Sequence, residues 1–76
     1  MKLSEWKIGY EGVITGVNAG ERKVKLFADY GLVKGAKIKL IALSPFNGPA
    51  IYSVGGAEIA LRLIDAAKVD AEVYSL

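Results

Sequence analysis

The sequence predicts a mainly β protein: a small closed barrel of five short strands with one short helix. Nine glycines beside only two prolines favour a fold with many tight turns over a helical bundle. Short stretches of β-branched and alternating apolar residues recur between these turns, which is typical of strands. A length of 76 residues leaves room for one domain, residues 1–76. Barrel closure removes the exposed edges that an open sheet would leave.

The short α-helix is expected at residues 23–30. Val24, Phe27 and Ala28 fall on one helix face at the spacing i, i+3, i+4. Gly31 follows at the position of a C-terminal cap, where the backbone needs a conformation that glycine adopts readily. A second, shorter helical turn is expected near residues 63–68, where alanines and charged residues replace the alternating pattern.

The five strands are separated by turn residues, and Gly55-Gly56 has the pattern of a two-residue hairpin turn. In the second strand, Leu40, Ile41 and Leu43 place apolar groups on both faces. That strand is therefore either covered on both sides or presents an exposed apolar patch. The expected strands are residues 12–17, 37–43, 51–54, 58–62 and 69–74.

The residue types of an enzyme site are poorly represented. The chain has no histidine and no cysteine, so none of its hydroxyl groups has an imidazole base. No pair of carboxylates has a spacing characteristic of acid–base chemistry. We therefore expect no catalytic residues, no enzyme activity and no cofactor. The hydroxyl side chains considered were Ser4, Thr15, Ser44, Ser53 and Ser75.

Metal binding by the usual ligands is also disfavoured, because iron and zinc sites usually recruit imidazole or thiolate groups. Asp70 and Glu72 share one face of the last expected strand and could together hold a hard cation. A solvated outer face is the simpler interpretation of the same two carboxylates. We therefore expect no metal site.

Positive charge is concentrated in the middle of a chain whose net charge is only +2. Phe27 and Tyr30 lie within this basic stretch, a combination that can support nucleic-acid binding. The alternative is that Phe27 belongs to the core and Tyr30 covers it. We expect acidic partners rather than nucleic acid. The basic residues are Arg22, Lys23, Lys25, Lys34, Lys37 and Lys39.

The N-terminal residues 1–7 contain no apolar segment long enough for a signal peptide. The longest strongly apolar run is residues 40–43, whereas a membrane span needs roughly 20 residues. A cytoplasmic location is the expectation.

Four segments, taken together and in order, indicate a family. Residues 3–9 read Leu-x-x-Trp-x-x-Gly, residues 25–35 read Lys-Leu-Phe-Ala-Asp-Tyr-Gly-Leu-Val-Lys-Gly, residues 42–49 read Ala-Leu-Ser-Pro-Phe-Asn-Gly-Pro, and residues 59–62 read Ile-Ala-Leu-Arg. Their sequence and spacing resemble those of the FeoA-type ferrous iron transport proteins. Tyr30 stands where that family usually has a leucine.

The resemblance implies an SH3-like five-stranded barrel with a short helix. It also implies a small cytosolic companion of a large membrane ferrous iron permease that carries a cytosolic GTPase domain. A related domain forms the C-terminal part of some metal-dependent repressors, where it is regulatory. Transition-metal binding is often attached to this domain at the family level.

We therefore expect the protein to dock on the cytosolic side of that permease and to meet the membrane only through this partner. The expected contact surface is the helix and the turn after it, although Leu26 and Leu32 can equally be core residues. Two alternatives remain: an SH3-like nucleic-acid-binding module, and a metal-responsive regulatory domain acting through Asp70 and Glu72. The expected contact residues are Lys25, Leu26, Tyr30, Leu32, Lys34 and Arg62.

Overall fold

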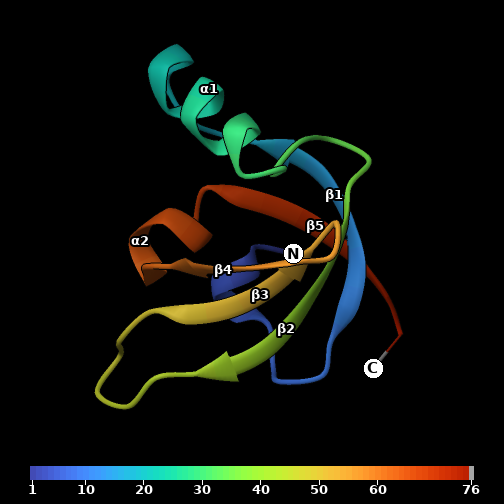
Figure 1. Cartoon of the computed structure of the whole chain (residues 1–76), viewed down its shortest axis with the longest axis vertical. Helices are drawn as coiled ribbons and strands as arrows, with labels where there is room; N and C mark the ends of the chain where they lie inside the picture. The colour runs from blue at the N-terminus through green and yellow to red at the C-terminus, as the bar shows by residue number, and fades with distance from the viewer. Residues whose placement is uncertain (76) are drawn as a thin grey trace.

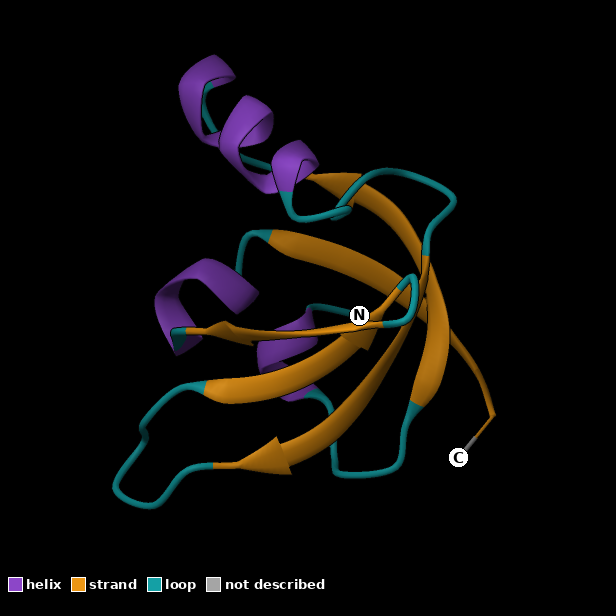
Figure 2. Ribbon diagram, in the orientation of Figure 1, coloured by secondary structure: helices purple, strands orange, loops and turns teal. Residues whose placement is uncertain are grey.

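The computed structural model describes residues 1–75 and has five strands, two α-helices and one 3-10 helix. Figures 1 and 2 show the strands curling around a central space, with α1 projecting from one end. The mainly β fold predicted from the sequence is confirmed, with element ends shifted by one or two residues. The elements are η1 (Leu3–Glu5), β1 (Glu11–Val17), α1 (Glu21–Asp29), β2 (Lys37–Leu43), β3 (Ala50–Val54), β4 (Ala57–Leu61), α2 (Leu63–Ala66) and β5 (Val69–Ser75).

The five strands form one antiparallel sheet in the order β4-β3-β2-β1-β5. The outer side of β5 is met by the N-terminal segment: Lys2 bridges to Asp70, and the Ala71 N–H donates to the Met1 carbonyl at 2.9 Å. Strand β4 is the opposite end of the sheet and pairs with β3 alone in the described part of the chain. The predicted closure is therefore wrong at one place: within the described residues, hydrogen bonds leave an open seam of the barrel beside β4.

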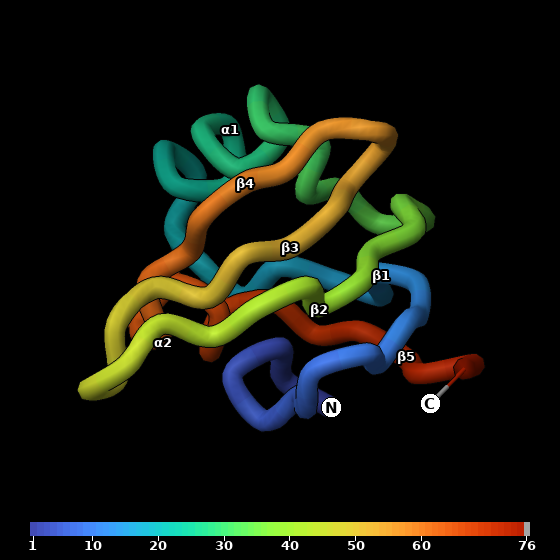
Figure 3. Tube along the Cα trace, turned by 60° about the horizontal axis from the view of Figure 1, so that its bottom comes forward, coloured from blue at the N-terminus to red at the C-terminus, as the bar shows by residue number. Residues whose placement is uncertain are grey.

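The core lies inside the curled sheet. Tyr52 stands at its centre: its hydroxyl donates to the Leu3 carbonyl at 3.1 Å, and burial raises the pKa of this phenol to about 12. This hydrogen bond fastens η1 against the sheet, at the lower end of the view in Figure 3. The buried apolar residues are Leu3, Trp6, Ile14, Phe27, Leu32, Ile38, Leu40, Ala50, Tyr52, Val54, Leu61, Ala66, Val69 and Ala71.

The apolar residues on both faces of β2 are explained by a β-bulge. Leu40 pairs with Tyr52 and Ala42 with Ile51, so Ile41 is an extra residue in this part of the ladder. Leu40 is buried, whereas Ile41 is 38% exposed and Leu43 is 51% exposed. Of the two possibilities left open by the sequence, the exposed patch is the one found.

Helix α1 begins at Glu21, two residues earlier than predicted, and ends at the expected glycine cap. Gly31 has a φ of +85°. Its N–H donates to the Ala28 carbonyl, and the Leu32 N–H donates to the Phe27 carbonyl, each at 3.0 Å. This pair of bonds is a Schellman motif, in which the residue after the glycine folds back onto the last helical turn.

The three residues of the predicted helix face differ in burial. Phe27 is buried, but Val24 is 37% exposed and Ala28 is exposed. Helical periodicity shows which residues share a face, but it does not show whether another element covers that face. Of the residues in α1, Phe27 alone is buried, so the helix is anchored to the core through one aromatic side chain.

Candidate functional site: a groove between helix α1 and strand β4

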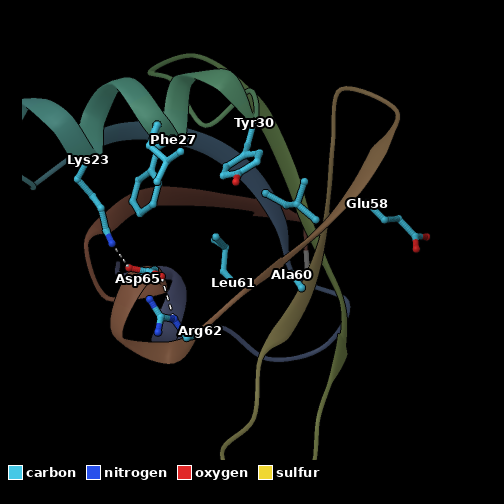
Figure 4. Close-up of a pocket in the computed structure, with 10 residues that line it drawn as sticks. Lys23, Phe27, Tyr30, Glu58, Ala60, Leu61, Arg62 and Asp65 are labelled. Carbon is cyan, nitrogen blue, oxygen red and sulfur yellow. Dashed lines mark ion pairs between the residues drawn. The ribbon is translucent and has the colours of Figure 1, made fainter.

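A groove of about 470 Å³ runs along the seam of the barrel, between α1 and β4. Three residues of α1 and Tyr30, which follows the helix, line one side, and residues 58–61 of β4 line the other. Arg62 and Asp65 close one end. Figure 3 shows the two elements side by side, and Figure 4 shows the side chains. We call this feature the α1–β4 groove.

The floor and the helical rim of the groove are apolar. Phe27 points down from α1 and Leu61 points up from the end of β4, and both are buried (Figure 4). Leu26 is 44% exposed and Tyr30 is 51% exposed, and both belong to the groove lining. The groove therefore combines a fixed core surface with two accessible apolar side chains.

One end of the groove carries a cluster of three charges. The Lys23 ammonium lies 3.1 Å from Asp65 Oδ1, outside hydrogen-bond alignment, and Arg62 Nε lies 3.5 Å from Oδ2 (Figure 4). Burial alone would raise the pKa of Asp65, but Lys23 and Arg62 outweigh it and hold this pKa below its usual value. Two cations face one carboxylate, so this end of the groove has excess positive charge.

Acid is expected to destabilise the protein through Asp65. The Asp65 carboxylate binds a proton more readily in the unfolded state than in the folded state, because the fold lowers its pKa. The stabilisation is complete above the ordinary carboxyl pKa of about 4 and is lost as the pH falls through the lower folded value. Asp65→Asn should reduce the free energy of unfolding at pH 7 by about 1–2 kcal/mol.

Urea unfolding between pH 7 and pH 2 measures this contribution. Asp65→Asn should show a smaller loss of stability on acidification than the wild-type protein. Asp29→Asn removes an exposed carboxylate from the same region and controls for net charge. An unchanged pH dependence in Asp65→Asn would contradict the assigned role of the ion pairs.

The groove unites three of the residues that the sequence predicts as a contact surface: Leu26, Tyr30 and Arg62. Lys25 and Lys34 are exposed but lie outside its lining. The Lys25 ammonium lies 3.8 Å from a Glu21 carboxylate oxygen, one helical turn away.

Leu32 does not belong to the surface. Its side chain is 1% exposed, because the Schellman motif folds it back beside Phe27. The alternative that Leu32 is a core residue is therefore confirmed, whereas Leu26 is accessible. Position alone separates the two, since Leu32 directly follows the Gly31 cap, a place where apolar residues often pack onto the last turn.

Three residues of the groove were not predicted from the sequence. Ile59, Asp65 and Lys23 line it, yet none was expected at a contact surface. Lys23 and Asp65 come from helices far apart in the chain, so no local spacing links them. For Ile59, the available signal was its alternation with Leu61 in β4, which places the two side chains on one face.

Few residues have the features expected of the two alternative functions, nucleic-acid binding and metal-responsive regulation. Phe27 is 2% exposed and cannot stack on a nucleobase. Asp70 is half-buried and Glu72 is exposed on β5. Within residues 1–75, no three side chains of the histidine, cysteine, aspartate and glutamate types gather closely enough to hold a metal ion. None of the helices described is long and apolar enough to span a membrane.

Known proteins resemble this chain in sequence and in fold. The sequence model of the FeoA domain matches residues 1–73. The chain belongs to the FeoA domain family. A curated relative from Porphyromonas gingivalis, the Fe(2+) transport protein A/Fe(2+) transporter FeoB fusion protein, is 32% identical over 75 residues. This match covers 99% of the chain but only 9% of the relative.

Solved FeoA structures share the fold. The FeoA protein from Chlorobium tepidum is 31% identical, with a TM-score of 0.90 over 99% of this chain and 71% of that one. FeoA from Stenotrophomonas maltophilia, described as a prokaryotic SH3 domain protein and solved with zinc, is 28% identical. Its TM-score is 0.81, over 95% of this chain and 89% of that one. The SH3-like class expected for the barrel is confirmed, and the family is associated with ferrous iron transport.

Proposed function

We propose that this protein is a non-catalytic accessory factor of ferrous iron uptake that docks on the cytosolic side of a FeoB-type permease. The α1–β4 groove and the helix beside it form the docking surface. The observation that carries this proposal is a helix held to the core by Phe27 alone, with Leu26 and Tyr30 exposed next to an apolar groove.

The fusion protein of Porphyromonas gingivalis supports the choice of partner. There a FeoA-like segment and a FeoB transporter are parts of one polypeptide. A covalent link raises the effective concentration of two binding modules and makes weak contacts between them productive.

The exposed side of α1 supports the choice of surface. An amphipathic helix of a monomeric protein normally turns its apolar stripe to the core. Here Leu26 and Tyr30, which lie one helical turn apart beside the groove, remain 44% and 51% exposed. An accessible apolar patch with polar groups at its rim is typical of a protein interaction site.

Recovery of the permease from detergent-solubilised membranes tests the proposal. Tagged protein should retain the FeoB-type permease specifically, and added guanine nucleotide should change the yield if the GTPase domain forms the contact. Recovery of nucleic acid instead, with retention that falls steeply as salt rises, would favour the nucleic-acid-binding module. Recovery of neither would contradict the accessory role.

A double substitution tests the turn after the helix. Tyr30→Ser with Lys34→Ser should weaken permease retention by about tenfold, mainly because a rim aromatic is lost. Both residues are exposed, so the circular dichroism spectrum should not change. Lys34→Ser alone should have less than about a twofold effect, since Lys34 lies outside the groove and surface charges contribute little. Equal losses in both variants would show that the docking surface does not depend on the groove rim.

A further inference from the structure

Strand β4 ends the sheet with a regular, unprotected edge. Its register with β3 runs without a shift from Ala57 to Leu61, whereas the β2–β3 and β1–β5 ladders are bulged. Natural edge strands are commonly blocked by proline, lysine or a bulge. Strand β4 reads Ala-Glu-Ile-Ala-Leu, so Glu58 is its one charged residue.

The hairpin turn determines which backbone groups are free. Gly55 and Gly56 both have positive φ values, +57° and +85°, as expected of a primed two-residue turn. The pair next to such a turn is hydrogen-bonded, and hydrogen-bonded pairs alternate along the ladder. The N–H and C=O groups of Ala57, Ile59 and Leu61 therefore face β3, while those of Glu58 and Ala60 face outward.

We propose that β4 accepts an extended segment of the partner protein as an additional strand, laid along the α1–β4 groove. This inference rests on the proposed docking function and specifies how the partner is held. Glu58 and Ala60 together offer two donors and two acceptors, because each residue has one N–H and one C=O. Addition of a strand to such an edge is a recurrent mode of peptide recognition.

The groove determines the side chains of the added segment. Alternate residues of a strand point to the same face, so every second residue of the segment lies on the face of Ile59 and Leu61. That face meets Phe27 and Tyr30 across the groove. The segment therefore carries apolar side chains at alternate positions.

The charged residues at one end of the groove determine which residue of the bound segment lies there. The side chain of Arg62 is 72% exposed and only 3.5 Å from Asp65, whose other oxygen is already paired with Lys23. The excess positive charge at this end of the groove favours a carboxylate on the bound segment. The occupant is thus an extended segment with alternating apolar residues and an acidic residue beside Arg62.

A partner segment fits the edge better than a second copy of this chain does. The free edge lies beneath α1, in a groove bounded on both sides (Figure 4). A single extended chain can enter this groove. The β4 edge of a second copy would bring its own α1 into the same space.

Hydrogen exchange with a synthetic peptide tests the proposal without the permease. The probe is an eight-residue peptide of alternating valine and threonine with a terminal aspartate, at about 1 mM, a concentration suited to weak binding. Exposed edge amides exchange rapidly, so binding should slow exchange at Glu58 and Ala60 by at least about tenfold. The inward amide of Ile59 should change little.

Ala60→Pro removes one outward N–H and leaves the β3–β4 ladder intact, because proline is tolerated where an edge N–H faces solvent. It should abolish protection at Glu58, whereas Ala60→Thr, which keeps the N–H, should retain it. Arg62→Gln serves if Ala60→Pro fails to fold. It should weaken the aspartate peptide by about fivefold, as expected for loss of one charged contact, and leave an asparagine-ended peptide nearly unaffected.

Three results would overturn the proposal: unchanged exchange in the wild-type protein, equal protection in Ala60→Pro, or protection by self-association without peptide. Because the permease is absent from this assay, failure here leaves the accessory role standing. Conversely, a failed membrane recovery would leave the peptide result intact. The two hypotheses are therefore tested separately.

Discussion

Replacing Gly12 with alanine is expected to lower the free energy of unfolding by about 3 kcal/mol, the upper range for overpacking a core. A methyl group at this position would overlap the carbonyl oxygen of Glu72 and lie 3.0 Å from Val73 Cα. Both are backbone atoms of β5, so relief requires the two paired strands to separate. Urea unfolding followed by circular dichroism measures the loss.

Gly16→Ala is the matched control for this substitution. Gly16 lies on the same strand, and a methyl group there meets no atom within 4 Å. Its expected effect is within about 0.5 kcal/mol, as for most surface substitutions. Equal losses in the two variants would show that the close approach of β1 to β5 does not set the requirement for glycine at position 12.

Phe27→Ala is expected to lower the free energy of unfolding by about 3–5 kcal/mol, as for other buried aromatic residues. Phe27 is 2% exposed and connects α1 to the core. A domain of this size has a total stability of only about 5 kcal/mol, so the variant should retain about 0–2 kcal/mol and unfold at a much lower temperature. Thermal unfolding and the helical signal in circular dichroism report this directly.

Val24→Ala provides the comparison on the same helix. Val24 is 37% exposed, so its loss should reduce stability by less than about 1 kcal/mol. A cost for Phe27→Ala as small as that of Val24→Ala would contradict the single-anchor description of α1. Phe27 also forms part of the groove floor, so variants at this position are unsuitable for testing docking.

The sequence allowed local features to be predicted well. The Gly55-Gly56 turn and the Gly31 cap were found because positive φ angles restrict the residue type at each position. The strands were found because β-branched or alternating apolar stretches are separated by turn residues. Burial was harder to predict, since Leu26 and Leu32 are both leucines near the helix end and only the geometry after the cap distinguishes them.

The groove could not be predicted because it is made by elements distant in the chain. Pattern analysis identified α1 and β4 separately, but not that they border the same seam. Arg62 was expected among the contact residues, and the structure places it at the end of the groove beside Asp65. The pairing of Lys23 with Asp65 depends on tertiary structure and leaves no mark in local spacing.

A comparison of two double variants tests the central hypothesis that the α1–β4 groove face docks on the permease. Leu26→Ser with Tyr30→Ser removes one leucine and one aromatic residue from the groove rim. Leu43→Ser with Phe46→Ser removes the same types from the distant β2–β3 end, where Leu43 is 51% and Phe46 is 99% exposed. Permease retained from membranes is measured for both.

The groove variant should retain at least about tenfold less permease than the wild-type protein, as when interface anchors are removed. The β2–β3 variant should bind like the wild-type protein. Equal unfolding curves for the two variants would show that stability is not the cause of the difference. Full retention by the groove variant, with loss in the β2–β3 variant, would contradict the account and move the docking surface to the opposite end of the barrel.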